Sequence, residues 1–362
     1  MKSILKLLAS KPGIILTGAV IGVLAPVLVS LGNPANMGIC VACFERDIAG
    51  ALGLHRAAVV QYLRPEIPAF VLGSFLAALL AGEWKPRTGS APVVRFVLGA
   101  FSMIGALVFL GCPWRAWLRL AGGDWNAIFG LLGLFAGIVA GIVFLKRGYS
   151  LGRNYPSPTA LGFVMPVLSA GLLVLAVVVP LFGRGADGQA VGPIFRSSTG
   201  PGSMAAPLAV SLVAGLVIGF LAQRTRFCTV GAVRDVVLFR DPHLALGIGS
   251  LFVVALLTNL ALGQFSAGFQ NRPVAHTDGL WNFGGMLLSG LAFTLAGGCP
   301  GRQLFLSGEG DGDAGVFVLG MIVGAGFAHN FNLASSTAGP SPYGPTATIV
   351  GLVVVAGIGM TF

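Results

Sequence analysis

Two five-residue motifs combine a cysteine, a proline and an arginine where apolar runs end. They are Gly111-Cys112-Pro113-Trp114-Arg115 and Gly298-Cys299-Pro300-Gly301-Arg302, and their equivalent residues are 187 positions apart. Proline suits the first position of a helix, where its missing N–H costs nothing, so each motif predicts a helix whose N-cap is the cysteine. The free N–H groups of such a helix start favour an anion, and Arg115 or Arg302 adds a full charge. The motifs therefore predict thiols beside an anion-binding site.

A second pair of loops repeats with an offset of 188 residues. Its matching residues are Cys40 with Cys228, Arg46 with Arg234, Asp47 with Asp235, and His55 with His243. Each adjacent Arg-Asp pair can neutralise itself and fix its loop, which is the role that we predict for it. The histidines could relay protons, but a histidine that caps a turn at the membrane interface is the simpler interpretation.

Three further matches fall on the 187-residue offset: Asp124 with Asp311, Gly133 with Gly320, and Gly137 with Gly324. Coincidence does not explain so many, and the chain is interpreted as a duplication. The four-residue spacing of the glycines predicts close packing of helix backbones. The alternative for the cysteines, small residues that merely allow packing, is weakened because they recur together with arginine.

The remaining cysteine, Cys43, forms the pattern Cys40-Val41-Ala42-Cys43, which has the spacing of a redox pair or half a zinc site. Cys43 aligns with Gly231 in the second copy, and no second such pair is present to complete a zinc site. Five cysteines are an odd number, and four of them occupy equivalent loops, so a disulfide framework is not expected. We predict neither a bound metal nor a cofactor.

The composition places these motifs in a membrane protein. Of 362 residues, 55% are hydrophobic and 9% are charged, and the mean hydropathy is +0.89, which excludes an ordinary soluble protein. The net charge of +10 does not indicate nucleic-acid binding, because the basic residues stand singly between apolar runs. The lipid bilayer is the expected partner.

Ten apolar stretches are near the length needed to cross hydrocarbon: 13–32, 66–82, 92–110, 126–145, 159–182, 205–222, 244–264, 281–297, 314–330 and 345–361. The first resembles a signal peptide, but it is long and has no clear cleavage site, so we expect a retained span. The duplication divides the chain into a first repeat, 1–182, a connecting loop, 183–204, and a second repeat, 205–362, with 159–182 corresponding to 345–361.

Five spans in each repeat put the second copy in the opposite orientation, as in many transporters. The segments 34–54 and 224–240 are too polar to span and are predicted to be re-entrant, each with a short helix after its cysteine. All five lysines (Lys2, Lys6, Lys11, Lys85 and Lys146) fall on one side of this arrangement, which predicts that both termini are cytoplasmic. The expected fold is an all-α integral membrane protein with nine or ten transmembrane helices, short re-entrant helices and inverted repeats.

With Gly38-Ile39-Cys40, Arg226-Phe227-Cys228 and the two Gly-Cys-Pro-x-Arg motifs, the chain resembles the YeeE/YedE family of sulfur-transport membrane proteins. Cys40 with Arg46-Asp47, and the second motif running on to Asp313, are similar to the YedE branch, which is described as transporting selenium compounds. The resemblance implies an hourglass-shaped inner-membrane protein in which thiosulfate passes along successive thiols. It assigns functional cysteines to Cys40, Cys112 and Cys299, and Cys228 would add a station.

The resemblance also implies a separate, small cytosolic sulfur carrier of the TusA type as a partner. Two classes of function remain open. One is a permease for a small sulfur- or selenium-containing anion, with no catalytic residues. The other is a membrane thiol-redox enzyme that uses Cys40 and Cys43. A redox pair would face solvent or quinone and would not need two matched motifs, so the duplication favours the permease, and we expect that the protein is not an enzyme.

Overall fold

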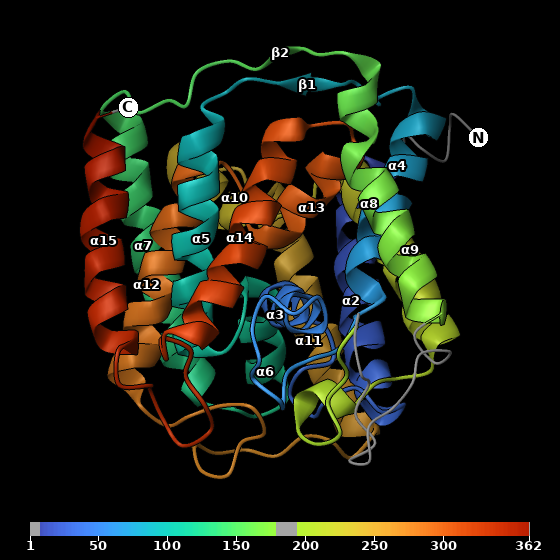
Figure 1. Ribbon diagram of the computed structural model, residues 1–362, viewed down its shortest axis with the longest axis vertical. Coiled ribbons are helices and arrows are strands. Elements are labelled where there is room, and N and C mark those ends of the chain that lie inside the picture. Colours follow the sequence, from blue (N-terminus) through green and yellow to red (C-terminus); the bar gives the residue numbers. More distant parts are fainter. Residues whose placement is uncertain (1–7, 179–193, 362) are drawn as a thin grey trace.

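The computed structural model describes residues 8–178 and 194–361, and it is built almost entirely of helices (Figure 1). Each of the ten predicted spans contains one long helix: α2 (Lys11–Ser30), α4 (Glu66–Ala81), α5 (Pro92–Phe109), α7 (Asn126–Lys146), α8 (Thr159–Val178), α9 (Leu208–Thr225), α11 (His243–Ala261), α12 (Gly279–Leu295), α14 (Gly312–Asn330) and α15 (Gly344–Thr361). In the described part of the chain, nine helical segments are long and apolar enough to cross a membrane, and the 16-residue α4 is shorter. The prediction of an all-α membrane protein is confirmed.

Four short helices and a small strand pair complete the described structure. The short helices are α3 (Val41–Ala51), α6 (Pro113–Ala121), α10 (Thr229–Phe239) and α13 (Pro300–Gly308), and a 3₁₀ turn, η2, covers Pro201–Ser203. The strands are β1 (Arg87–Thr88) and β2 (Tyr155–Pro156), which pair antiparallel. The short helices after Cys40 and Cys228 were predicted, whereas nothing in the sequence indicated the strands.

The long helices run in opposite directions in the two halves (Figure 1). We call the end of the molecule that holds β1 and β2 the upper end. The helix α2 runs from the upper end to the lower one, and its counterpart α9 runs from the lower end to the upper one. The short helices α3 and α6 lie in the lower half, and α10 and α13 lie in the upper half. This is the arrangement that the predicted inverted repeats require.

Glycines bring the two halves into contact at equivalent places. A Cβ at Gly133 or Gly137 of α7 would overlap the backbone of α12 at Phe283 or Leu287. In the same way, a Cβ at Gly320 or Gly324 of α14 would overlap the backbone of α5 at Phe96 or Ala100, which are the equivalent residues. The predicted packing role of these glycines is therefore confirmed, and it occurs once in each half.

The symmetry ends at the last helix of each repeat. The helix α8 packs mainly on α4, with smaller contacts to α13 and α14, whereas α15 packs on α5 and α12. The correspondence of 159–182 with 345–361 therefore does not extend to packing. Both helices are largely exposed on the outside of the bundle, so few contacts constrain where they lie.

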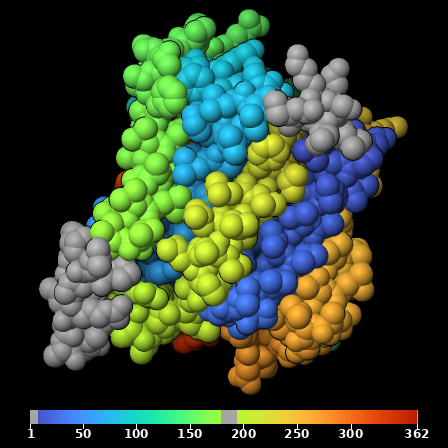
Figure 2. Space-filling model, turned by 90° about the vertical axis from the view of Figure 1, so that its right-hand side faces the viewer, coloured from blue at the N-terminus to red at the C-terminus, as the bar shows by residue number. Residues whose placement is uncertain are grey.

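The outer surface is apolar, as a lipid-facing surface must be. Figure 2 shows α8, α4, α9 and α2 as slanting columns on one face. Exposed apolar side chains on three of these helices include Val167, Val213 and Val23. Of the predicted connecting loop, residues 183–193 lie outside the described part of the chain. The remainder is fixed at the lower end, where Gln61 N donates to Ser197 Oγ at 2.9 Å and Gly202 N donates to Val59 O at 2.8 Å.

Candidate functional site: two clusters of buried thiols

Each short helix begins directly after a cysteine. Cys40, Cys112, Cys228 and Cys299 are the N-caps of α3, α6, α10 and α13. Cys40 Sγ accepts a hydrogen bond from Cys43 N and Cys228 Sγ accepts one from Gly231 N, both at 3.3 Å. In the other two helices proline follows the cysteine, as predicted. Each thiol is thus positioned by the start of a helix.

The structure groups the thiols by repeat. The thiols of Cys40 and Cys112 lie close to each other, and Cys43 N donates to Cys40 Sγ; we call these three the first thiol cluster. In the second repeat Cys299 N donates to Cys228 Sγ at 3.5 Å, and the two thiols lie close to each other; these two form the second thiol cluster. All five cysteines are free and buried.

Arg115 lies against the first thiol cluster. Its guanidinium is 0% exposed and donates to Cys43 Sγ at 3.3 Å, to Asn36 O at 2.8 Å, to Val274 O at 2.9 Å and to Leu110 O. Every one of these acceptors is neutral, and in residues 8–178 and 194–361 no carboxylate forms an ion pair with Arg115. A buried cation without a countercharge is costly, so this site is suited to an anion. The contact with Cys43 was not predicted, because Cys43 has no counterpart in the second repeat.

Arg302 has a different environment. It forms an ion pair with Glu309 at 3.1 Å and lines a hollow of about 450 Å³ near the upper end. Cys228 also lines this hollow, together with other basic and acidic side chains: Arg224, Arg226, Arg234, Asp235 and Asp241. The second thiol cluster is therefore next to a hollow that solvent can enter.

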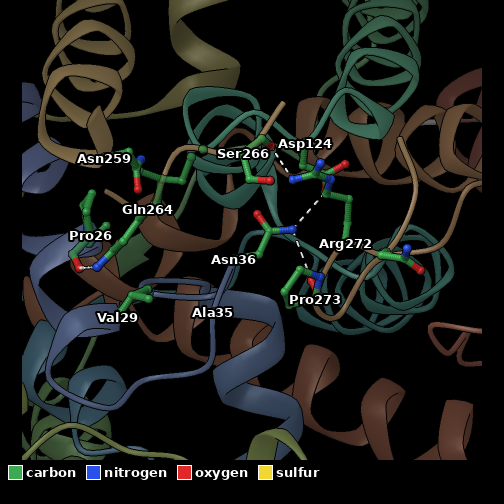
Figure 3. Close-up of a pocket in the computed structure, with 15 residues that line it drawn as sticks. Pro26, Val29, Ala35, Asn36, Asp124, Asn259, Gln264, Ser266, Arg272 and Pro273 are labelled. Carbon is green, nitrogen blue, oxygen red and sulfur yellow. Dashed lines mark hydrogen bonds between the residues drawn. The ribbon is translucent and has the colours of Figure 1, made fainter. Parts of the chain in front are cut away.

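A second hollow, of about 350 Å³, lies at the lower end (Figure 3). Asn36 reaches across it and donates to Asp124 Oδ2 at 2.8 Å and to Pro273 O at 3.1 Å. The carbonyl of Asn36 accepts from Arg115, so this residue connects the hollow with the first thiol cluster. Asp124 also forms a buried ion pair with Arg119 at 2.7 Å.

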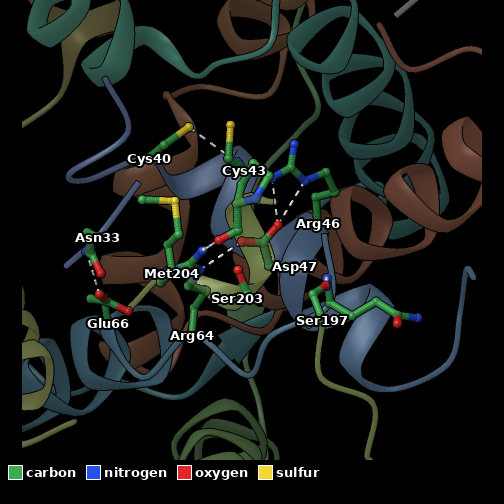
Figure 4. A network of polar contacts seen from close by, with 12 residues as sticks. Asn33, Cys40, Cys43, Arg46, Asp47, Arg64, Glu66, Ser197, Ser203 and Met204 are labelled. Atoms are coloured by element: carbon green, nitrogen blue, oxygen red, sulfur yellow. Dashed lines mark hydrogen bonds and ion pairs between the residues drawn. The ribbon is translucent and has the colours of Figure 1, made fainter. Parts of the chain in front are cut away.

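The two Arg-Asp pairs form as predicted, but their burial differs. Asp47 pairs with Arg46 at 2.6 Å and with Arg64 at 2.8 Å, and Arg64 also donates to the carbonyls of Pro201 and Met204 (Figure 4). This network ties α3 to the segment before α4 and, through Arg64, to the segment before α9. Arg234 pairs with Asp235 alone, at 2.8 Å, in a half-buried position.

The two predicted histidines are not equivalent in space. The His55 ring bonds to Arg46 O at 3.0 Å, accepts from Ala57 N at 3.3 Å and stacks on His329 at 4.4 Å. Burial lowers the pKa of His55, which favours the neutral ring of a turn-capping residue. His243 is the first residue of α11 and lines the upper hollow. Its backbone N–H donates to Asp241 Oδ1 at 2.9 Å.

Sequence reasoning missed two residues. Trp114 lies inside the first motif and is packed among Phe70, Phe227 and Phe305. Glu45 is 0% exposed on α3, and neither of its carboxylate oxygens has a hydrogen-bond partner. A charged residue inside a stretch predicted to lie within the membrane is itself a signal that could have identified Glu45.

Comparison with known proteins finds a family similarity for one part of the chain. Residues 224–361, which include Cys228, Cys299 and Arg302, match the family model described as sulphur transport. This segment of the chain is thus similar to the sulphur transport family. Its curated relatives include the thiosulfate transporter TsuA of Spirochaeta thermophila, 32% identical over 99 residues, and that of Escherichia coli, 30% identical over 105 residues.

The family match covers the second thiol cluster, and the similarity to the curated relatives is partial. The two alignments each cover 27% of this chain, and they cover 29% and 28% of the lengths of the relatives. Less than a third of each relative is therefore matched. The first thiol cluster and Arg115 lie outside residues 224–361.

Proposed function

We propose that this protein is a permease that carries a small sulfur-containing anion such as thiosulfate across the cytoplasmic membrane. The observation that carries the proposal is Arg115, a fully buried guanidinium whose hydrogen-bond acceptors are all neutral, three residues after Cys112. A divalent anion that enters the membrane loses water and needs donors at each stage. Arg115 supplies one such stage.

The thiols supply the other stages. A fixed charge that binds an anion strongly would also trap it, whereas thiols are weak donors with polarisable sulfur, so contacts to them form and break at little cost. Cys112 and Cys40 would receive the anion from the lower hollow. Cys299 and Cys228 would pass it to the upper hollow, where Arg302 lies. The supporting pairs Arg46-Asp47 and Arg234-Asp235 hold α3 and α10 in position.

The orientation follows from charge. Lys11, Lys85 and Lys146 lie near the upper ends of α2, α4 and α7, so the upper end is proposed to face the cytoplasm, with both termini there. Cys228 lines the hollow at that end. A separate TusA-like sulfur carrier could therefore accept sulfur there, and this partner is part of the proposal. Selenium compounds are the related cargo that the same thiols could carry.

The decisive experiment measures uptake of labelled thiosulfate and of labelled selenite by cells that express the protein. We expect uptake by the wild type and loss of uptake in Cys112→Ala and Cys299→Ala at unchanged expression, since alanine fills nearly the same volume. Absence of uptake by the wild type would refute the permease. Near-normal transport by Cys299→Ala would refute the thiol relay and leave an anion pore.

Cys43→Ala is the matched control within the first thiol cluster. It should be mild, because Arg115 keeps its three carbonyl acceptors without the thiol. The thiol-redox alternative makes the opposite prediction, since that enzyme would depend on Cys43. Both Cys40 and Cys43 are 0% exposed, whereas a redox pair would have to meet a protein or a quinone.

A further inference from the structure

Trp114 and Gly301 occupy equivalent positions in the two Cys-Pro motifs, and they touch each other. A Cβ at Gly301 would lie 2.9 Å from Cζ2 and 3.3 Å from Cε2 of the Trp114 indole. Equivalent residues of inverted repeats can meet only close to the pseudo-two-fold axis that relates them. One repeat therefore places a large ring at the axis, and the other repeat, with glycine, leaves room for it.

The indole lies between the two thiol clusters along the chain and in space. Trp114 is two residues after Cys112, Gly301 is two residues after Cys299, and Phe227 directly precedes Cys228. The ring centroid of Trp114 is 5.4 Å from that of Phe227, 5.9 Å from Phe305 and 6.3 Å from Phe70. Aromatic side chains from α4, α6, α13 and the segment before α10 thus separate the clusters.

The polar atom of this ring has no partner. Trp114 is 1% exposed, and its Nε1 has no hydrogen-bond acceptor among residues 8–178 and 194–361. A buried indole N–H normally finds an acceptor, because leaving a donor unpaired is unfavourable. Nε1 is bonded to Cε2, and Cε2 belongs to the ring edge that faces Gly301. The free donor is therefore next to the start of α13, two residues beyond Cys299.

We propose that Trp114 is a substrate-binding residue, whose indole N–H receives the sulfur anion as it passes from the first thiol cluster to the second, and whose ring closes this passage when no anion is present. The inference rests on the proposed function and adds a central station to it. An N–H donor strengthens when its acceptor is charged, and an apolar ring excludes water and leaves no continuous path for other ions. Gly301 is then the residue that allows the ring to lie there.

The same helix provides a matched control. Trp117, one turn further along α6, also has a buried Nε1 without an acceptor, but its ring packs on Phe135 and Phe252, at an apolar surface hollow. Trp117→Phe removes the same donor group away from the thiols. A difference between Trp114→Phe and Trp117→Phe therefore reports on the position of the N–H and not on the loss of an indole.

The test measures thiosulfate uptake into proteoliposomes as a function of concentration. We expect Trp114→Phe to raise the KM by about tenfold or more, as loss of a hydrogen bond to a charged group does, while Trp117→Phe keeps the wild-type KM. Because phenylalanine is smaller, a second variant carries 3-benzothienylalanine at position 114, which keeps the shape of the ring and removes only the N–H. It should also raise the KM.

A binding measurement provides a second readout. In a protein whose Trp84, Trp117, Trp125 and Trp281 are replaced by Phe, thiosulfate should change the fluorescence of Trp114, and sulfate serves as the comparison. Wild-type uptake combined with an unchanged KM in both position-114 variants would overturn this inference alone. A wild type that takes up no thiosulfate would overturn the proposed function, and this inference with it.

Discussion

Equivalent aspartates in α3 and α10 allow a test of whether buried ion pairs keep the short helix α3 in place. Asp47→Asn removes the carboxylate that pairs with both Arg46 and Arg64, whose side chains are 2% and 0% exposed. Asp235→Asn makes the equivalent change in α10, where Arg234 is the only ion-pair partner in the described part of the chain and the side chains of Asp235 and Arg234 are 19% and 32% exposed. The chemistry of the two substitutions is identical, and only the environment differs.

The environment sets the magnitudes. Removing one partner of a buried ion pair costs about 3–5 kcal/mol, because the charge that remains is buried without compensation. Here two guanidiniums would lose their countercharge, although Arg64 keeps the carbonyls of Pro201 and Met204. A partly exposed pair contributes about 0–1 kcal/mol. We therefore expect a loss of at least about 3 kcal/mol for Asp47→Asn and of less than about 1 kcal/mol for Asp235→Asn.

Thermal unfolding of the purified protein in detergent measures the difference. All five cysteines are buried and free, so a thiol-reactive fluorophore reports unfolding as they become accessible. At one scan rate, Asp47→Asn should lower the Tm by roughly 5–15 °C, and Asp235→Asn by at most about 3 °C. Equal decreases in the two variants would refute the conclusion that burial of the Asp47 network holds α3.

Three further predictions concern other parts of the molecule. Gly137→Ala should lower the Tm because its Cβ would overlap the backbone of Leu287, at a cost of about 1–3 kcal/mol. Gly249→Ala on α11, where a Cβ would enter open space, should stabilise the folded protein by up to about 1 kcal/mol. Equal effects of the two substitutions would contradict the close-packing role of Gly137. Burial raises the pKa of Asp124, but Arg119 and the hydrogen bond from Asn36 outweigh burial and hold that pKa below its usual range. The stability that Asp124 contributes is therefore present above its pKa in the unfolded chain and is lost as the pH falls through its pKa in the folded protein. Between pH 7 and pH 3 the Tm should fall less in Asp124→Asn than in the wild type, and parallel curves of Tm against pH would refute this. Glu45→Met should leave the Tm unchanged or raise it, since it removes an unpartnered buried carboxyl, and a large decrease would show that Glu45 has a partner in the folded protein.

Much of the fold could be read from the sequence because it depends on local rules. The length of an apolar run sets the length of a span, and proline after cysteine sets a helix start. The offsets of 187 and 188 residues predict a duplication, and an odd number of spans in each copy then predicts inversion. The strand pair β1–β2 was beyond this reasoning, because two residues on each side carry no periodic signal. It is held from outside by Asp313, which accepts hydrogen bonds from Thr88, Gly89 and Ser90.

By itself, the sequence determined that this is an all-α membrane protein with a thiol at the start of each short helix, and it predicted a duplication. Only the tertiary structure decided which thiols meet. The contacts of Cys40 with Cys112 and of Cys228 with Cys299 join residues about 70 positions apart, and they depend on how far each short helix enters the bundle. The contacts of Arg115 with Cys43 and of Trp114 with Gly301 also arise from packing between separate segments. Such contacts have no signature in local spacing, because a pair of residues leaves a pattern in sequence only when one helix or one turn connects them.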